Sequence, residues 1–550
     1  SEDVIKAVHE LVEKENIEAL SICFLNSYAN PENEQLAADM VQKEYPDLYI
    51  SASNDVFPFM REYERWTTTS MNAYVQPAAD RYLGKLEKSL EDQHFVGRFY
   101  VMTSSGGMVA TQTARKYPIR LLESGPAAGA IMSAYHGRMT GADSVLSFDM
   151  GGTTAKGALI RGGQPLKTYE TEVARVHEFK AGSGLPAKAP SIDMIEIGSG
   201  GGSIAEIDER GVIRVGPKSS GSVPGPACYS LGGKQPTLTD ANLVLGYLDP
   251  NFFLGGRMKL DKGAAEAVID ANIGRPLSLD SVRGAWGIHE IVNEDIARAF
   301  RVHASERGFD YRHTSMVGFG GSGPMHAARV ARKLKVPRIV FPMGAGVMLA
   351  FGLLISPISF ELVASKRMSL CGLTERMINN IFLPMENKAT AILQDSVIDG
   401  NSIVMNRKVD MRYEGQGYEI EIPANEGPDE LSNSFEAEYK SIFTSITSAG
   451  ALEVVNWKLE ASTQQNGKIE RFEFPPHSTT DPIKNWRSAF FAEPNDYIET
   501  PVYDRYALKV GDKFKGPAII EENESTIVIG VKDEVEIDQA RNIIVKISSY

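Results

Sequence analysis

The sequence lacks the marks of disulfide-bonded, membrane-spanning and secreted proteins. Its 550 residues include three cysteines, Cys23, Cys228 and Cys371, which lie far apart in the chain. An odd and scattered set of cysteines argues against a disulfide framework and favours a reducing cytoplasm. The longest apolar stretch, around 347–355, is interrupted by Gly352 and falls well short of the roughly 18 residues that span a membrane. No basic segment followed by an apolar run opens the chain, so we predict no signal peptide.

The sequence also has no excess of positive charge. It contains 57 Lys and Arg residues against 71 Asp and Glu residues, a formal net charge of −14, and no long basic run. Because nucleic acids are bound through clustered cations, this balance argues against a nucleic-acid partner. Hydrophobic residues make up 43% and charged residues 23%, which is typical of a soluble globular protein. The length favours about three or four domains.

Local signatures of several enzyme classes are missing as well. The chain has no GxxxxGKS or GxxxxGKT phosphate loop, which excludes a P-loop ATPase. It has no HExxH or CxxC motif, so no single short segment predicts a metal site. It has no GxSxG elbow of the kind that carries a nucleophilic serine.

Glycine is abundant in one part of the chain only. Of the 50 glycines, 38 lie between residues 101 and 360. Glycine concentrated in a globular chain indicates many tight turns or close approaches of the backbone to a ligand.

The first 50 residues alternate between helix and strand patterns. We predict helices over 3–15 and 31–43, and strands over 17–25 and 48–51, as in a parallel sheet. An α/β unit normally opens with the strand on which its helix packs, and here a helix comes first. We therefore expect the first part of this domain to be absent from the chain.

Composition and periodicity divide the chain into three predicted domains. Residues 1–135 form the remainder of a first α/β domain, residues 136–365 the glycine-rich core, and residues 366–550 a separate β-rich domain. The strands of the last domain are predicted over 402–423 and 497–548 from alternating apolar and polar residues.

The segment from Ser147 to Lys156 is the strongest candidate site. A buried strand over 144–148 ends at Asp149, two glycines allow a tight turn, and a return strand completes a β-hairpin. Backbone N–H groups of such a turn can face phosphate oxygens, and the carboxylate can hold Mg²⁺ or orient a water molecule. The candidate phosphate contacts are Gly151, Gly152, Thr153 and Thr154. The alternative is an ordinary hairpin with a Gly-Gly turn.

A second candidate joins a strand over 316–319 to a helix over 325–333. The connecting residues are Gly320, Gly321, Ser322, Gly323 and Pro324. A glycine-rich loop that enters a helix N-terminus is a natural nucleotide site, although it is also a common way to connect a strand to a helix. His326, near the helix start, could act as an acid or base, but more often such a histidine caps or packs.

Three further features have weaker implications. The loop over 197–203 is either pressed on a ligand or a tight crossing between chain segments. Cys228 has no neighbour that would lower its pKa, so we expect it to be buried rather than nucleophilic. Asp240 and Asn242 lie where a helix is predicted to begin, and we expect both to cap it.

These motifs together resemble a known superfamily. The segment 147–156 resembles the phosphate hairpin of the actin–hexokinase–heat-shock-chaperone ATPases, and 318–324 resembles their adenosine motif, in the expected order. Over nearly all its length the chain resembles the A-type subunit of the hydantoinase/oxoprolinase family. Matching stretches run from Cys23 to Tyr28 and Arg61 to Arg65 through to Gly516 to Glu521. The most specific are Ser124 to Gly129, Asp149 to Thr153, Gly216 to Cys228 and Gly320 to His326.

The resemblance implies a fold, an activity and partners. The fold would be an α/β, actin/hexokinase-like (ribonuclease-H-like) ATPase core. The activity would be ATP-dependent hydrolysis of a cyclic amide, in which ATP and Mg²⁺ phosphorylate a carbonyl oxygen before ring opening. A B-type subunit would assist, in a homo- or hetero-oligomer. Asp149 would be the catalytic and metal-binding residue, with phosphates at 151–154 and the adenosine side at 320–323.

Two departures from the family leave alternatives open. No Asp-x-Gly-Gly-Thr segment precedes Asp149, so the first phosphate loop is missing and the ATP clamp would be half built. Lys156 stands where many relatives have Asp. The main alternative is the ATP-handling subunit of an acetone- or acetophenone-type ketone carboxylase. A third is a structural or regulatory subunit without catalytic activity.

Overall fold

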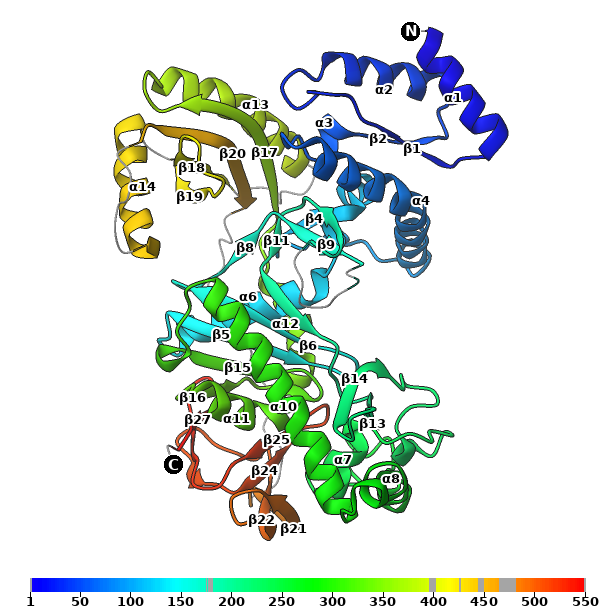
Figure 1. Ribbon diagram of the computed structural model, residues 1–550, viewed down its shortest axis with the longest axis vertical. Coiled ribbons are helices and arrows are strands. Elements are labelled where there is room, and N and C mark those ends of the chain that lie inside the picture. The colour runs from blue at the N-terminus through cyan, green and yellow to red at the C-terminus, as the bar shows by residue number, and fades with distance from the viewer. Residues whose placement is uncertain are drawn as a thin grey trace. The chain divides into compact units, whose positions relative to one another are not determined.

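The computed structural model describes residues 2–174, 176, 182–394, 402–424, 427–443, 450–463 and 481–548 (Figure 1). Their contacts form two compact units. Unit 1 comprises residues 1–127, 167–192 and 356–468, and unit 2 comprises residues 128–166, 193–355 and 469–550. The three consecutive domains expected from the sequence, 1–135, 136–365 and 366–550, stay a prediction.

Unit 1 begins with the predicted alternation of helices and strands. Its first elements are α1 (Glu2–Glu15), β1 (Ala19–Ile22), α2 (Glu32–Glu44) and β2 (Tyr49–Ala52). Strands β1 and β2 are parallel, with Ala19 opposite Tyr49. Apolar residues from all four elements pack together, because each helix turns one apolar stripe towards the strands.

A four-stranded antiparallel sheet forms another part of unit 1, in the order β17-β20-β18-β19. These strands are β17 (Ser359–Ser369), β18 (Ile403–Tyr413), β19 (Ile420–Pro423) and β20 (Leu452–Thr463). The other helices of the unit are α3 (Ser53–Val56), α4 (Glu62–Asp92), α5 (Thr111–Lys116), α13 (Glu375–Gln394) and α14 (Pro428–Phe443). Its short strands are β3 (Tyr100–Met102), β4 (Met108–Ala110), β8 (Lys167–Thr168), β9 (Thr171–Val173), β10 (Leu185–Ala187) and β11 (Ser191–Ile192).

Unit 2 is built on a nine-stranded sheet in the order β12-β6-β5-β15-β16-β27-β26-β23, with β7 beside β6. Figure 1 labels β5, β6, β15, β16 and β27 of this sheet. Strands β5, β15 and β16 are parallel, whereas β6 runs antiparallel to β5. The strands are β5 (Ser144–Met150), β6 (Ala155–Arg161), β7 (Gln164–Pro165), β12 (Met194–Ile197), β15 (Ser315–Phe319), β16 (Arg338–Phe341), β23 (Lys513–Lys515), β26 (Glu534–Ile537) and β27 (Ile543–Lys546). This arrangement confirms the predicted ribonuclease-H-like core.

Both faces of the central sheet are covered, and strand β5 shows why. Leu146, Phe148 and Met150 point into a core that includes Phe300 of helix α10 (Ser281–Glu306). The alternate residue Val145 points into a second core with α6 (Ser124–Met139) and α12 (Met348–Ile355). Because side chains alternate along a strand, Asp149 belongs to the second face, as does Ser147.

The remaining elements of unit 2 surround this sheet. The helices are α7 (Leu238–Val244), α8 (Lys262–Ile269), α9 (Arg275–Leu277) and α11 (Gly323–Leu334). A hairpin pairs β13 (Ser203–Ile207) with β14 (Ile213–Ser219). A second sheet has the order β21-β22-β24-β25, with strands β21 (Ile483–Phe491), β22 (Asp496–Asp504), β24 (Ala518–Glu521) and β25 (Thr526–Ile529).

The region after residue 366 is rich in strands, as predicted, and it contributes to both units. Strands β18, β19 and β20 belong to the antiparallel sheet of unit 1. Strand β27 pairs antiparallel with β16 and so extends the central sheet of unit 2. The apolar stretch at 347–355 forms the short helix α12, and no helix within the described ranges is long and apolar enough to cross a membrane.

Replacement of Gly157 by Ala is expected to destabilise unit 2. Gly157 lies on β6, and a Cβ there would overlap the ring of Phe300, which is fully buried. Overpacking of this kind costs about 1–3 kcal/mol. Scanning calorimetry on G157A should show a lower unfolding temperature, whereas G417A, where a Cβ would meet open space, should match the wild type. An unchanged unfolding temperature for G157A would contradict this packing.

Candidate functional site

The end of strand β5 carries the predicted hairpin. Asp149 lies opposite Lys156 in the β5–β6 register, and the turn between them is closed by the Gly151 N–H, which donates to the Thr154 carbonyl at 3.1 Å. The hairpin predicted from the sequence is therefore present.

The loop over 320–323 lies directly against this hairpin. The Ser322 N–H donates to the Met150 carbonyl at 2.9 Å. Gly320 has a φ of +87°, and a Cβ at this position would overlap the Asp149 carboxylate and lie 2.5 Å from the Met150 oxygen. Both the backbone conformation and the close approach therefore require glycine.

The loop over 198–202 crosses the same turn from the other side. The N–H groups of Gly201 and Gly202 donate to the carbonyls of Gly151 and Gly152 at 3.0 and 2.6 Å. A Cβ on Gly200 would lie 2.6 Å from the carbonyl carbon of Gly152. Of the two interpretations left open by the sequence, the structure confirms the tight crossing between chain segments.

Helix α7 fixes this crossing loop. The hydroxyl and the N–H of Thr239 both donate to the Gly201 carbonyl, each at 2.8 Å. Thr237 and Asp240 form a reciprocal capping box at the start of the helix, so the capping role predicted for Asp240 is confirmed. Asp240 also accepts from the N–H of Cys228 at 2.8 Å. The Cys228 side chain is fully buried, as predicted, and burial raises its pKa.

The predicted capping role of Asn242 is wrong. This residue lies in the body of α7, where backbone N–H groups already have acceptors within the helix. Its side chain is buried and bonds instead to His289 and His326. His326 is fully buried, and it therefore packs inside the unit rather than facing a substrate.

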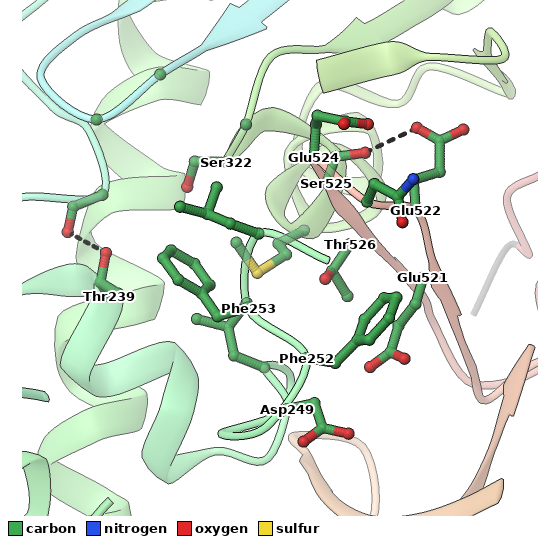
Figure 2. Close-up of a pocket in the computed structure, with 18 of the residues that line it drawn as sticks. Thr239, Asp249, Phe252, Phe253, Ser322, Glu521, Glu522, Glu524, Ser525 and Thr526 are labelled. Carbon is green, nitrogen blue, oxygen red and sulfur yellow. Dashed lines mark hydrogen bonds between the residues drawn. The ribbon is translucent and has the colours of Figure 1, made fainter. Parts of the chain in front are cut away.

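A cavity of about 190 Å³ opens beside the three loops (Figure 2). Four of the nine predicted site residues line it, namely Gly151, Gly152, Gly321 and Ser322. The other five, Asp149, Thr153, Thr154, Gly320 and Gly323, are not among its lining residues. The Ser322 hydroxyl is buried and has no hydrogen-bond partner within the described residues. A buried hydroxyl without a partner is uncommon, and a ligand in the cavity could supply one.

Two walls of the cavity come from segments that the motifs did not identify. Phe252 and Phe253 line one side, and the turn between β24 and β25, residues 521–526, lines another (Figure 2). The segment 516–521 already matched the family, and this was the one signal that pointed towards the second wall. No pattern marked the two phenylalanines, because adjacent aromatic residues in a loop are usual in any core.

Most of the carboxylates in the 521–526 turn already have partners. Glu521 pairs with Lys484 at 2.7 Å and with Arg487 at 2.6 Å. Glu522 and Arg505 form a fully buried pair at 3.2 Å, and the N–H groups of Gly344 and Ala345 donate to the same carboxylate. Burial raises the pKa of Glu522, while Arg505 and these donors oppose the shift. The Glu522 carboxylate therefore joins the turn to the segment that follows β16.

Asp149 differs from these carboxylates in its surroundings. Burial raises its pKa to about 6, and Lys156 is the charge that opposes this shift. Lys156 itself pairs with Glu196 of β12 at 3.3 Å. Strongly shifted carboxyl groups that lie beside other candidate site residues are typical of functional sites.

The donor set suits a metal ion that arrives with a nucleotide. Within the described ranges no group of three or more His, Cys, Asp or Glu side chains is placed to hold a metal. Mg²⁺ commonly keeps several waters and uses one or two carboxylates together with substrate phosphates. Asp149 beside the hairpin fits that pattern, whereas an autonomous metal site does not.

Comparisons with known proteins agree with this architecture. The model of the hydantoinase/oxoprolinase family matches residues 65–361, and that of the hydantoinase/oxoprolinase C-terminal domain matches residues 371–547. The chain is 31% identical to the caprolactamase alpha subunit of Pseudomonas jessenii, over 98% of this chain and 77% of that one. It is 30% identical to the acetophenone carboxylase gamma subunit of Aromatoleum aromaticum, over 98% of this chain and 75% of that one.

A solved structure extends the likeness to three dimensions. The crystal structure of the ATP-dependent caprolactamase from Pseudomonas jessenii aligns with a TM-score of 0.85 and 30% identity, covering 100% of this chain and 80% of that chain. Two family models match the chain, its relatives match over most of their length, and the fold is shared. These findings agree with the motifs found in the sequence. The chain belongs to the hydantoinase/oxoprolinase family.

Proposed function

We propose that this chain is the ATP-using subunit of an enzyme that hydrolyses a cyclic amide. The observation that carries the proposal is the packing of three glycine-rich segments around the end of β5. They lie beside a cavity lined by the Ser322 hydroxyl, which has no hydrogen-bond partner in the described part of the chain. The similarity to an enzyme whose title calls it an ATP-dependent caprolactamase supports the same activity here.

The nucleotide would lie along the cavity with its two ends against different loops. The phosphates would extend past Gly152 beyond the cavity, where the backbone N–H groups and the hydroxyls of Thr153 and Thr154 would donate to phosphate oxygens. The Gly151 N–H closes the turn, so Gly151 would contribute a close approach and not a donor. On the adenosine side, the Ser322 hydroxyl would donate, with Gly320, Gly321 and Gly323 allowing the backbone to approach.

The aromatic wall suits the base of the nucleotide. Phe252 and Phe253 line the cavity with Gly321 and Ser322. Aromatic faces stack on nucleobases with little dependence on base identity. We assign these two rings to the adenine side of the same site.

The chemistry would be phosphorylation of an unreactive carbonyl. The amide oxygen of the substrate would form a bond to the γ-phosphorus while the bond to the β-phosphate oxygen breaks and ADP leaves. Water would then add to the phosphorylated ring carbon, and the C–N bond would break with the ring nitrogen leaving as an amine. A second water would release inorganic phosphate from the resulting acyl phosphate and leave the carboxylate. Such transfer depends mainly on positioning and charge neutralisation. Asp149 would hold Mg²⁺, which supplies neutralisation of phosphate charge when it is bound.

The relatives suggest a partner. Both sequence relatives above are named as subunits of larger enzymes, which supports an assembly with a separate B-type subunit that completes the hydrolysis. A cytoplasmic location stays a prediction from the few, scattered cysteines.

Replacement of Asp149 by Asn should abolish ATP turnover and leave the fold intact. The substitution removes the one carboxylate at the hairpin that could hold Mg²⁺, and such losses cost several orders of magnitude in rate. Steady-state ATP hydrolysis of the assembled enzyme with a cyclic amide would measure this, with circular dichroism to check the fold. D143N, an exposed residue just before β5, is the matched control. Full turnover by D149N would remove Asp149 from the mechanism.

The stability of D149N should exceed that of the wild type at neutral pH. The pKa of Asp149 is about 6 in the folded protein and 3.8 in its ordinary state, so the folded state binds the proton more tightly. The wild type therefore loses stability relative to D149N as the pH rises from about 4 to 6, on the order of 2 kcal/mol. Scanning calorimetry of both proteins without metal or nucleotide would test this. A difference that does not vary with pH would contradict it.

Ketone carboxylation is the second candidate, because a carboxylase gamma subunit is nearly as similar as the caprolactamase subunit. The two activities share the phosphorylation step and differ in the co-substrate. We expect ATP turnover by the assembled enzyme to require a cyclic amide and to be independent of bicarbonate. Bicarbonate-dependent turnover with a ketone would favour the carboxylase. Absence of ATP binding to the wild-type chain in calorimetry would favour a structural subunit.

A further inference from the structure

Four buried side chains form one continuous hydrogen-bonded chain beneath the candidate site. His289 Nδ1 lies 2.8 Å from Asn242 Oδ1, Asn242 Nδ2 lies 3.3 Å from His326 Nε2, and His326 Nδ1 lies 2.9 Å from Asn293 Oδ1. All four residues are at most 2% exposed. The chain connects α7, α10 and α11, and we call it the imidazole–amide ladder.

The amide atoms determine the protons of the ladder. Amide oxygens accept and amide nitrogens donate, so both histidines carry a proton on Nδ1, and His326, whose Nε2 accepts from Asn242, is neutral. The donors then run in one direction, from His289 through Asn242 and His326 to Asn293. We assign both tautomers from these partners. A charged imidazole at His326 would place an N–H against the Asn242 amide N–H.

The surroundings keep the ladder neutral. Burial, together with the nearby Arg329 and Lys333, lowers the pKa of His289 to about 3. Burial and His289 together lower the pKa of His326 well below its ordinary value. The two imidazole rings stack with centroids 4.5 Å apart, and His289 also stacks on Trp286 at 5.4 Å.

Two members of the ladder, Asn242 and His326, lie in helices that border the cavity. His326 follows Met325, and both Met325 and Ser322 line the cavity at the start of α11. Asn242 is three residues after Thr239, which lines the cavity and holds the Gly201 carbonyl. The ladder therefore links the loop at 320–323 with the segment that holds the loop at 198–202.

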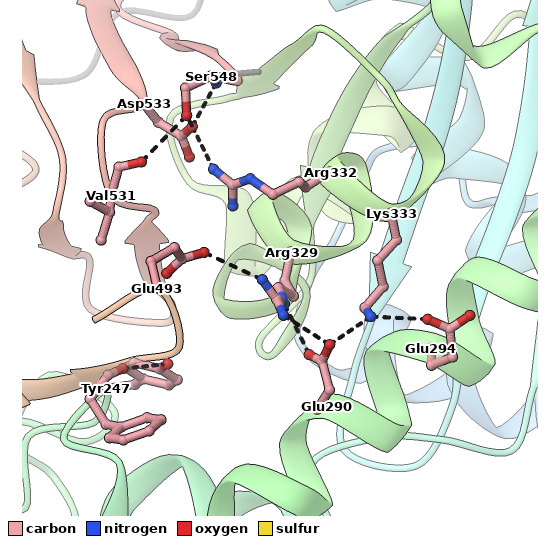
Figure 3. Close-up of polar contacts among 11 residues, drawn as sticks. Tyr247, Glu290, Glu294, Arg329, Arg332, Lys333, Glu493, Val531, Asp533 and Ser548 are labelled. Carbon is pink, nitrogen blue, oxygen red and sulfur yellow. Dashed lines mark hydrogen bonds and ion pairs between the residues drawn. The ribbon is translucent and has the colours of Figure 1, made fainter. Parts of the chain in front are cut away.

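Joining α10 to α11 does not by itself require this ladder. At the surface, Glu290 of α10 pairs with Arg329 at 2.9 Å and with Lys333 at 2.6 Å of α11 (Figure 3). Apolar side chains could fill the buried space at lower desolvation cost, because Nδ2 of Asn293 is buried without a hydrogen-bond partner among the described residues. The ladder also connects α11 to α7 through the bond between His326 and Asn242, and so fixes the position of one helix relative to the other.

We propose that the imidazole–amide ladder is a positioning device that fixes the glycine-rich loop at 320–323 relative to the phosphate hairpin, and that Asn242 is its central positioning residue. The proposal rests on the proposed nucleotide function of these loops. Asn242 touches no ligand in this scheme and acts through His326 and Thr239. Loss of the ladder should loosen the spacing between the two ends of the nucleotide site.

The test compares nucleotide affinity with stability. MgATP binding to the wild-type chain and to N242A and N242L is measured by calorimetry, and unfolding temperatures are measured alongside. We expect the dissociation constant for MgATP to rise about tenfold or more in both variants, because small misplacements of binding groups have large effects. V292A is the matched control, because Val292 is a fully buried apolar residue next to Asn293 on α10. It should lower the unfolding temperature and leave the MgATP affinity within a factor of about two.

A second variant covers the case in which the Asn242 variants do not fold. H289F retains a ring that can stack on His326 and removes the imidazole that donates from Nδ1 to Asn242, and we expect a smaller rise in the MgATP dissociation constant, about threefold. Nitrogen-15 spectra of labelled histidines in the wild type should show two neutral rings protonated on Nδ1. A proton on Nε2 of His326, or folded Asn242 variants with wild-type affinity, would overturn the ladder proposal. A wild-type chain that binds no MgATP would instead overturn the proposed function, and the nucleotide role of the ladder with it.

Discussion

The structure of the candidate site depends on backbone segments that approach more closely than side chains allow. At the end of β5, one turn is crossed on one side by the loop at 198–202 and on the other by the loop at 320–323. Each crossing is held by backbone hydrogen bonds to carbonyls of the residues that follow Asp149. A Cβ at Gly200 or Gly320 would overlap the hairpin. The concentration of glycine in the middle of the sequence therefore reflects contacts of the chain with itself as well as room for a ligand.

Carboxylates near this crossing have two different electrostatic environments. Glu522 is fully buried and is surrounded by Arg505, Ser525 and two backbone donors, so it serves the architecture. Asp149 is partly buried beside Gly320, and the charge that lowers its pKa, Lys156, is shared with Glu196. The first arrangement is typical of a structural ion pair. The second keeps a charged carboxylate at a cost in folding stability, which is expected of a residue that binds a ligand.

The sequence predicted the elements of the site much better than their surroundings. Strand β5, its hairpin, β15 and α11 follow from local patterns: a buried apolar run that ends at Asp149, and a second that ends at Gly320. The walls formed by Phe252, Phe253 and the turn at 521–526 come from distant segments, and no local rule indicates that two such segments meet. The role of Asn242 was missed for the same reason, since its partners His289 and His326 lie 47 and 84 residues away.

The segment from Thr237 to Asn242 shows how one short stretch can connect all of these parts. Thr237 and Asp240 close the start of α7, and Asp240 also holds the backbone at Cys228. Thr239 holds the loop that crosses the hairpin, and Asn242 bonds to the histidines of α10 and α11. Successive residues of a helix point in different directions, so Thr239 and Asp240 can serve different neighbours, whereas Thr239 and Asn242, three residues apart, lie on the same side of α7. The apolar residues of this seven-residue helix are buried in the core, and these polar bonds fix it from further sides, so the loops that depend on it share its position.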